Sequence, residues 1–482
     1  MIAQEMRWNK WFLPLIAILF VTACDDAGPL SQSRPLPFPT PGQQDLVVVT
    51  TSGPLTSSAD EAGKLSGLAV DLATAFAEEL NVGVRFVVVP PDRVDDELAA
   101  GKAHLAADWR SPPSDGLMKA TRPIALTEDL LVQHEASFPL DELSDLRDRT
   151  VHVVAGTRQA ETMRRLAKEI PGLQIVEETE RGIIELVEAV GRRKIELTVI
   201  ESRLEDIATQ FVPSVQVTLE VGAEQPVVWL LGEHPNVELE ARLAAFIERA
   251  RRDDTLNRLE DRYFGHTRRL TQADITKFLG QIETVLPKLR KHFHAAQTIS
   301  GIDWRLIAAV AYHESNWDAN ATSPTGVRGI MMLTEETADR LGVGNRLDPR
   351  ESILGGARYI NLLKDMLPGE VREPDRTWLA LAAYNIGPGH FGAGRRLAEL
   401  MKADPNVWYE MKDILPLLAQ PKYYEKVKSG RARGGEAVLL VENIRAYNDI
   451  LARHEPAYQA VSAKMESMAG MSGNMPGLKL KR

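Results

Sequence analysis

The sequence predicts a multidomain protein in which an α/β domain precedes a mostly helical domain. Three observations support this fold class. The chain has 482 residues, whereas one domain holds roughly 100 to 200. Between residues 45 and 265, short β-branched runs alternate with amphipathic helical stretches, which is the pattern of an α/β domain. Beyond about residue 270 the strand signal disappears and helices punctuated by Pro and Gly remain.

The elements of the α/β domain follow from these runs. The alternation predicts a mostly parallel sheet, and we place the domain boundary near residues 266–270, giving folded parts at 45–268 and 269–482. The expected strands are 46–51, 82–89, 151–155, 196–200 and 227–231, and the expected helices are 68–80, 160–169, 182–190 and 237–251.

The N-terminus has the pattern of an export signal. Arg7 and Lys10 precede an apolar run at 11–21, which small residues follow, and such a run is too short to span a bilayer comfortably. We therefore expect residues 1–23 to be a signal peptide and the mature protein to be extracytoplasmic. Val21-Thr22-Ala23-Cys24 resembles the lipobox of bacterial lipoproteins, which implies lipidation at Cys24; the alternative is an ordinary signal peptide with an incidental cysteine.

Composition restricts the partners and the chemistry. Residues 24–44 contain five prolines among Ser, Gly and Gln, which predicts an extended tether. The net charge of -10 argues against nucleic-acid binding, which needs a basic face. The single cysteine excludes an intramolecular disulfide and a cysteine-based metal site. Because the sequence has no apolar run of the roughly 20 residues that a spanning helix needs, we expect any membrane attachment to be peripheral or through a lipid.

Four motifs in the α/β part occur in a familiar order: GLAVDL at 67–72, LAAGKAH at 98–104, LSDL at 143–146, and Gly156-Thr157 before a helix. They resemble the periplasmic solute-binding proteins of the amino-acid-binding type, over roughly residues 45–265. The resemblance implies two α/β lobes that close on a small ligand, whose polar groups lie at strand ends and helix N-termini.

The expected ligand residues of this part are Arg110, Thr157 and Glu201. Thr157 opens a helix, and Glu201 stands where the resemblance places an acidic residue against a ligand amine. The Thr-x-x-Arg carboxylate clamp of that family is replaced by SPPS at 111–114, so Arg110 is the candidate substitute and a free α-amino acid is a doubtful ligand. A cell-wall-derived peptide is the expected ligand, and a purely structural role for Thr157 and Glu201 stays open.

The segment at 303–316 in the helical part carries a candidate acid. Residues 306, 307, 310 and 311 form an apolar stripe that ends at Glu314. A carboxyl group at the end of such a stripe is partly desolvated, and desolvation raises its pKa. A protonated carboxyl group near neutral pH suits a general acid. A solvated glutamate at a helix end is the alternative.

Further motifs in the helical part follow Glu314 over about 130 residues. They are Glu314-Ser315, Gly329-Ile330-Met331-Met332, Ala383-Tyr384-Asn385 and ENIRAY at 442–447. This ordered set is similar to that of the family 1 lytic transglycosylases. Together with the solute-binding-like part, the chain resembles the two-part, membrane-bound members of that family. The resemblance implies a goose-type lysozyme-like fold with a groove for a peptidoglycan glycan strand.

The resemblance also implies a mechanism without water. Glu314 would protonate the bond between N-acetylmuramic acid and N-acetylglucosamine and then act as base for ring closure to a 1,6-anhydro sugar. Ser315 and Asn385 would position the sugar, Tyr384 would line the groove and Tyr447 would hydrogen-bond near Glu314. In that family, glutamine is usual at the position of Met332. The substrate contact expected at Met332 would therefore come from a thioether and not from an amide. Ser315 as a local cap, and Tyr384 and Tyr447 as core aromatics, are the alternatives.

Two rival functions stay open. A hydrolytic goose-type lysozyme needs a second carboxylate, for which Asp318 and Glu335 are candidates. A non-catalytic glycan or muropeptide sensor is the other.

The H-E-x-x-H zinc motif fails at Trp317, and we expect no metal and no cofactor. The expected partners are peptidoglycan strands, muropeptides at the N-terminal domain, and the outer membrane. Because Asp25 directly follows Cys24, attachment to the inner membrane is the alternative.

Overall fold

The computed structural model describes residues 36–60, 63–112 and 118–459. The expected signal peptide, Cys24 and the first part of the tether lie outside these residues. Within the same ranges, no helix combines the length and the apolar character that a membrane span needs.

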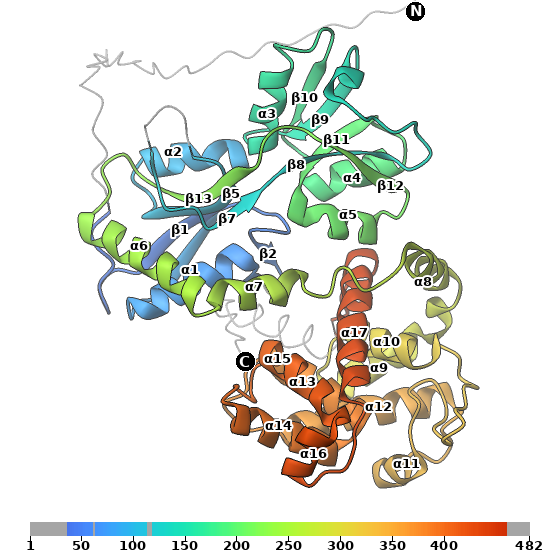
Figure 1. Ribbon diagram of the computed structural model, residues 1–482. Helices are drawn as coiled ribbons and strands as arrows, with labels where there is room; N and C mark the ends of the chain where they lie inside the picture. Colours follow the sequence, from blue (N-terminus) through green and yellow to red (C-terminus); the bar gives the residue numbers. More distant parts are fainter. Residues whose placement is uncertain (1–35, 61–62, 113–117, 460–482) are drawn as a thin grey trace, which may run out of the picture. The chain divides into compact units, whose positions relative to one another are not determined.

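The first lobe is built on a six-stranded sheet in which β4, β1, β5, β13 and β6 lie in this order and β7 pairs with β13 (Figure 1). Helices pack on it through Phe76 and Phe246, whose ring centroids are 5.2 Å apart. The elements are β1 (Leu46–Thr50), β4 (Val84–Val88), β5 (Leu105–Arg110), β6 (Lys119–Ala120), β7 (Ala125–Thr127), β13 (Gln225–Leu231), α1 (Leu68–Glu79), α2 (Val94–Ala99), α6 (Val237–Arg252) and α7 (Thr255–Phe264), with the short pair β2 (Ser58–Ala59) and β3 (Leu65–Ser66).

The second lobe has a five-stranded sheet in the order β10-β9-β11-β8-β12. Two hydrophobic clusters surround it, one against α4 and α5 and one against α3. The elements are β8 (Asp129–His134), β9 (Thr150–Val154), β10 (Gln174–Glu178), β11 (Leu197–Glu201), β12 (Val215–Glu220), α3 (Arg158–Leu166), α4 (Ile183–Gly191) and α5 (Glu205–Phe211). The four helices and five strands that the sequence predicts are all present, with ends shifted by at most three residues.

The prediction of a mostly parallel sheet is wrong, because both sheets are mixed. β1 is parallel to β4 and β5, and β9 is parallel to β10 and β11. In contrast, β13 runs antiparallel to β5, β6 and β7, and β8 runs antiparallel to β11 and β12. These two strands follow the points where the chain passes from one lobe to the other, so they enter their sheets from the opposite direction.

The last part of the expected tether packs on the first lobe. His104 Nε2 lies 2.9 Å from the carbonyl oxygen of Pro37. Phe38 packs against the cluster that contains Phe76, and Leu36 against the cluster that contains Val94. The part of the expected tether from residue 36 onward is therefore packed on the first lobe and is not a free spacer.

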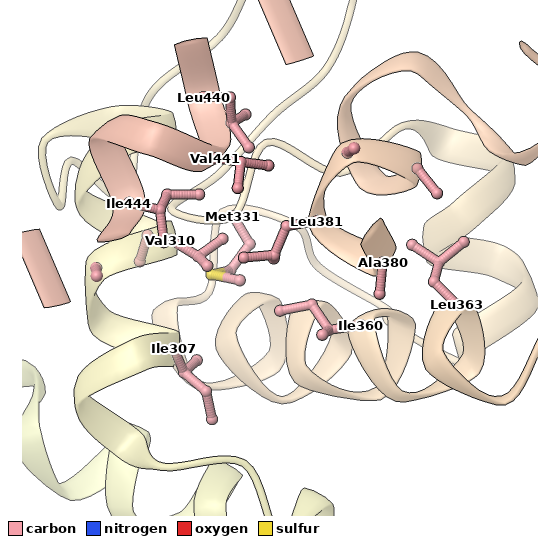
Figure 2. Close-up of a cluster of buried hydrophobic side chains, with 14 of the residues drawn as sticks. Ile307, Val310, Met331, Ile360, Leu363, Ala380, Leu381, Leu440, Val441 and Ile444 are labelled. Carbon is pink, nitrogen blue, oxygen red and sulfur yellow. The ribbon is translucent and has the colours of Figure 1, made fainter. Parts of the chain in front are cut away.

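The helical part has one hydrophobic core, to which α10, α12, α13 and α17 contribute (Figure 2). Val310 from α10 lies beside Met331 and Leu381, and Ile307 from α10 and Val441 and Ile444 from α17 belong to the same core. The helices are α8 (Gln272–Thr284), α9 (Leu286–Ser300), α10 (Trp304–Ser315), α11 (Glu335–Leu341), α12 (Pro349–Asp365), α13 (Asp375–Ile386), α14 (Pro388–Met401), α15 (Trp408–Ile414), α16 (Pro421–Val427) and α17 (Gly434–His454), with a 3-10 turn, η4, at Leu415–Ala419.

The helix α10 is fixed at both ends. At the start, the Asp303 side chain caps it by accepting a hydrogen bond from Arg305 N at 2.8 Å. At the end, Asn316 and Trp317 both have positive φ, 51° and 62°. The chain therefore leaves the helical conformation directly after Ser315. Trp317 then turns back, and its Nε1 donates to Ala308 O at 2.8 Å. The last helical turn, which carries Glu314, is therefore held in place.

Candidate active site and ligand cleft

Glu314 lies in the last turn of α10 with its side chain half-buried. Across the described ranges 36–60, 63–112 and 118–459, its carboxylate has no hydrogen bond and no ion pair. Burial alone raises the pKa of Glu314 to about 7, because a desolvated carboxylate favours its neutral form. This is the direction that the apolar stripe predicts, and it gives a carboxyl group that both gives up and takes a proton near neutral pH.

The preceding residue, His313, is held neutral. Burial lowers the pKa of His313 to about 4, so it carries no charge at neutral pH. Its Nε2 lies 3.4 Å from Asn443 Nδ2 on α17. A neutral imidazole next to the acid leaves the proton of Glu314 in place, whereas a cation there would favour the carboxylate.

A tight turn at residues 329–333 approaches the end of α10. Gly329 has φ of 81°, and a Cβ atom on it would lie 1.7 Å from Arg346 O, so the position requires glycine. Met332 also has positive φ, 46°, with a half-buried side chain. Such strain in a residue other than glycine occurs mainly at functional sites.

Ser315 and Tyr384 hold this turn from two sides. Ser315 Oγ lies within hydrogen-bond distance of two carbonyl oxygens, Ala311 O at 3.1 Å and Ile330 O at 2.9 Å. Tyr384 Oη donates to Met331 O at 2.6 Å. The structure thus gives both side chains a supporting role; their expected contacts with a sugar stay predictions.

Tyr384 is also close enough to Glu314 to be affected by its charge. Burial raises the pKa of Tyr384 well above its usual value, and the Glu314 carboxylate raises it further. Asn385, the next residue on α13, is exposed. The end of α13 therefore presents an exposed amide beside a tyrosine that the charge of Glu314 reaches.

Tyr447 lies in a buried aromatic cluster instead of bonding to Glu314. Its ring is 4.6 Å from Phe278 and 4.8 Å from Tyr312, both edge-on. Burial raises the pKa of Tyr447 above its usual value. The expected hydrogen bond near Glu314 is not among those of the described residues.

The α/β part contains a cleft of about 980 Å³, lined by residues of both lobes. Thr157 caps α3, with Oγ1 donating to Val154 O at 2.7 Å and accepting from Ala160 N. The next residue, Arg158, lines the cleft with only 3% of its surface exposed. Its Nη2 lies 2.9 Å from Asp129 Oδ1, whereas Nε and Nη1 have no hydrogen-bond partner among the residues that the structure describes.

Two buried carboxylates face the same cleft. Glu201 bonds to Thr127 and Arg203 through Oε1, and Asp108 pairs with Arg110 through Oδ2 at 2.6 Å. Within residues 36–60, 63–112 and 118–459, Glu201 Oε2 and Asp108 Oδ1 have no hydrogen-bond partner. Burial raises the pKa of both carboxyl groups. Unpaired buried groups of both signs are costly, so the cleft suits a ligand that supplies both charges.

The sequence predicts Arg110 as the substitute clamp and does not single out Arg158. Arg110 is already neutralised, since it donates to Asp108, Asp95 and Pro91 O. Arg158 has the free donors instead. Its position directly after Gly156-Thr157, at the first residue of the helix, was the available signal.

Known proteins resemble the chain over most of its length. The model of the bacterial extracellular solute-binding proteins, family 3, matches residues 46–266, and that of the transglycosylase SLT domain matches residues 291–403. A membrane-bound lytic murein transglycosylase F of Methylobacillus flagellatus is 38% identical over 95% of this chain and 97% of its own length. That of Nitrosospira multiformis is 42% identical over 86% and 87%. The chain belongs to the membrane-bound lytic murein transglycosylase F family.

The two matched regions divide the family's chain as the structure does. The solute-binding match covers the two lobes, and the transglycosylase match covers α10 with Glu314 and α13 with Tyr384 and Asn385. Among solved structures, an ancestral arginine-binding protein bound to arginine is 21% identical and covers 46% of this chain and 98% of its own, with a TM-score of 0.42.

Proposed function

We propose that the chain is a peptidoglycan lytic transglycosylase that cleaves the β-1,4 bond between N-acetylmuramic acid and N-acetylglucosamine with Glu314 as its acid and base. The observation that carries the proposal is the half-buried, unpaired Glu314 carboxyl group with a pKa of about 7. Family membership at 38% to 42% identity over most of the chain supports the same activity.

The chemistry needs only this one group. Glu314 gives its proton to the glycosidic oxygen as the bond from C1 of N-acetylmuramic acid breaks. The resulting carboxylate then takes the proton from the C6 hydroxyl of the same sugar as O6 bonds to C1. The acid is regenerated, no water is consumed and the strand ends in a 1,6-anhydro sugar.

The surroundings of Glu314 favour this route over hydrolysis. A hydrolytic enzyme uses a second carboxylate to orient water. The two candidates are exposed: Asp318 accepts from Asn320 N, and Glu335 lies 3.6 Å from Arg346. Neither contributes to the pKa of Glu314, which burial alone raises. Exposed Asn385 and half-buried Met332 are our candidates for contacts with the sugar, while Ser315, Tyr384 and Tyr447 support the site.

The test is product analysis of digested sacculi. The wild type should release muropeptides that end in 1,6-anhydro-N-acetylmuramic acid, and reducing ends would identify a hydrolase. Glu314→Gln keeps the shape of the side chain without its titrating proton, so turnover should fall by roughly 100- to 10,000-fold or more. Near-normal turnover of this variant would place the acid elsewhere.

A second function is favoured by the polar lining of the cleft. We infer that the α/β part binds a cell-wall-derived peptide, whose carboxylate meets Arg158 and the N-terminus of α3 while an ammonium group meets Glu201 and Asp108. The helix α17 connects the cleft with the helix that carries the acid. Its residues Asp449 and Arg453 line the cleft, and its residue Asn443 contacts His313. A ligand that binds better to one arrangement of α17 would bias activity.

Calorimetry with purified muropeptides on the whole mature chain tests this binding. Arg158→Met should abolish it. Arg164→Met is the matched control, because Arg164 lies on the same helix and its ion pair with Glu177 is exposed. Equal binding by both variants, or an absence of binding to the wild type, would leave the cleft without this role.

For localisation, we propose the periplasmic side of the envelope, with attachment to the outer membrane through lipid on Cys24; Asp25 directly after it leaves the inner membrane as the alternative. Cys24→Ala should release the protein into the soluble periplasmic fraction. A variant that stays membrane-bound with its apolar segment uncleaved would mean that this segment is an anchor.

A further inference from the structure

A short basic segment stands out in the helical part of an acidic protein. Residues 421–433, here called the basic segment, contain five Lys or Arg residues and one Glu, whereas the whole chain has a net charge of -10. The segment comprises α16 and the loop that leads into α17. Its cations are Lys422, Lys426, Lys428, Arg431 and Arg433.

These cations face solvent and most lack a counter-charge. All five residues are exposed. Of these five cations, only Arg433 makes an ion pair with another described residue, namely Glu436 at 3.3 Å. Lys422 and Lys426 lie one turn apart on either side of Tyr423, 5.2 Å and 5.9 Å from its ring centroid, which keeps the two charges together. Like charges one turn apart are unfavourable in a helix, so this arrangement favours an anionic partner.

The segment lies within reach of the acid. It leads directly into α17, which starts at Gly434. Asn443 on α17 contacts His313, the neighbour of Glu314, and the nine helical steps from Gly434 to Asn443 span roughly 14 Å along the helix. The end of the segment that joins α17 is therefore about one extended tetrapeptide, also roughly 14 Å, from the helix turn that carries the acid.

We propose that the basic segment binds the carboxylates of the peptides that substitute the glycan strand, so that the enzyme prefers peptide-bearing strands to naked ones. This inference rests on the proposed transglycosylase function, because only a strand at Glu314 places its peptides at this distance. The peptide stems of peptidoglycan carry free carboxylates, and each exposed ion pair adds a small, salt-sensitive contribution. Several such pairs together shift KM and leave the chemical step unchanged.

An anionic lipid surface offers the same charge, but the geometry favours the strand. Every productive complex with a peptide-bearing strand holds a substituted sugar near Glu314 and so brings carboxylates towards the basic segment. A bilayer would need no such proximity to the acid. Lipid binding is therefore the outcome that would contradict the proposal.

The test compares two triple variants with the same change in charge. Lys422→Gln/Lys426→Gln/Lys428→Gln removes three cations from the basic segment. Lys277→Gln/Lys288→Gln/Lys291→Gln removes three exposed lysines from α8 and α9 and is the control. Both should fold, as thermal unfolding would show, since all six side chains are exposed. Each enzyme is assayed on peptide-bearing strands and on strands stripped of peptides by an amidase.

The basic-segment variant should lose about tenfold in kcat/KM on peptide-bearing strands at low salt, mainly through KM, and less than twofold on naked strands. The control should lose little on either. Equal losses by both variants, or none, would overturn the proposal. So would a basic-segment variant that keeps its preference for peptide-bearing strands but no longer binds vesicles of phosphatidylglycerol and phosphatidylethanolamine. A wild type that cuts neither substrate would instead contradict the transglycosylase function.

Discussion

Two glutamates of the helical part, half-buried Glu314 and fully buried Glu442, have opposite environments. Glu314, at the end of α10, has no partner among the described residues, and burial raises its pKa to about 7. Glu442, in the middle of α17, is fully buried. It accepts from Trp408 Nε1 at 2.7 Å and pairs with Arg445 through both oxygens at 2.9 and 3.0 Å.

The partners decide what burial does to each carboxyl group. Burial alone would raise the pKa of Glu442 as well, but the charge of Arg445 and the hydrogen bond from Trp408 outweigh it and lower the pKa. Glu442 is thus a permanent anion that also fixes Arg445, whose Nη2 donates to Asp261 O and Arg262 O. A desolvated glutamate is therefore an acid where it lacks a cation and a hydrogen-bond donor, and a structural anion where both are present.

The largest expected effect comes from the ion pair of Glu442. Glu442→Gln leaves the Arg445 guanidinium buried without its counter-charge, and breaking a buried pair costs roughly 3 to 5 kcal/mol. Urea unfolding at pH 7 should show this loss of stability. Folded enzyme at low temperature should keep its activity, since Glu442 does not reach the substrate. A loss of activity without a loss of stability would contradict the structural role.

The same substitution at Glu314 should have the opposite effect on stability. The folded pKa of about 7 lies above the ordinary value of 4.5, so the contribution of this carboxyl group to stability is complete below pH 4.5 and is lost as the pH rises through 7. At about 1.4 kcal/mol per unit, Glu314→Gln should be more stable than the wild type by up to about 3 kcal/mol above pH 7. The gain should vanish near pH 4.5. An equal gain at both pH values would mean that deprotonation of Glu314 is not its cause.

Catalysis should depend on pH through the same group. Because the first step needs protonated Glu314, kcat/KM should fall about tenfold per pH unit above about 7. Initial rates on naked strands between pH 5 and 9 give the profile. A rate that stays constant up to pH 9 would show that Glu314 is not the acid.

Most of the fold could be predicted from the sequence. Strands such as β1 and β11 and helices such as α1 and α6 have strong local patterns, and the structure places them within a few residues of the prediction. The direction of β8 and β13 could not be predicted, because it depends on which lobe the chain enters and not on the residues of the strand. The packing of Phe38 on the first lobe was hidden by the prolines around it.

The candidate site was predictable where its chemistry depends on one helix. The apolar stripe of α10 predicts the desolvation of Glu314 because the stripe and the acid share one periodicity. The roles of Ser315 and Tyr384 could not be predicted, since their partners Ile330 O and Met331 O lie on a turn that only the tertiary fold brings near. Likewise, the pairing of Arg110 with Asp95 and that of Arg158 with Asp129 could not be predicted, because each joins residues that lie far apart in the sequence and meet only in the folded lobe.

The smallest expected effect concerns the support of the turn beside Glu314. Tyr384→Phe removes the hydroxyl group that donates to Met331 O at 2.6 Å and keeps the ring that packs against Tyr359 at 5.3 Å. The loss of one hydrogen bond should cost about 1 kcal/mol of stability. Loosening the turn should also let water reach the acid, so the upper limb of the pH profile should move below 7 and the loss of turnover should be small at pH 5 and larger at pH 8. Tyr359→Phe is the matched control, because it removes a nearby hydroxyl group that does not bond to the turn. Equal shifts in both variants would mean that the aromatic packing, and not the hydrogen bond to Met331, keeps Glu314 protonated.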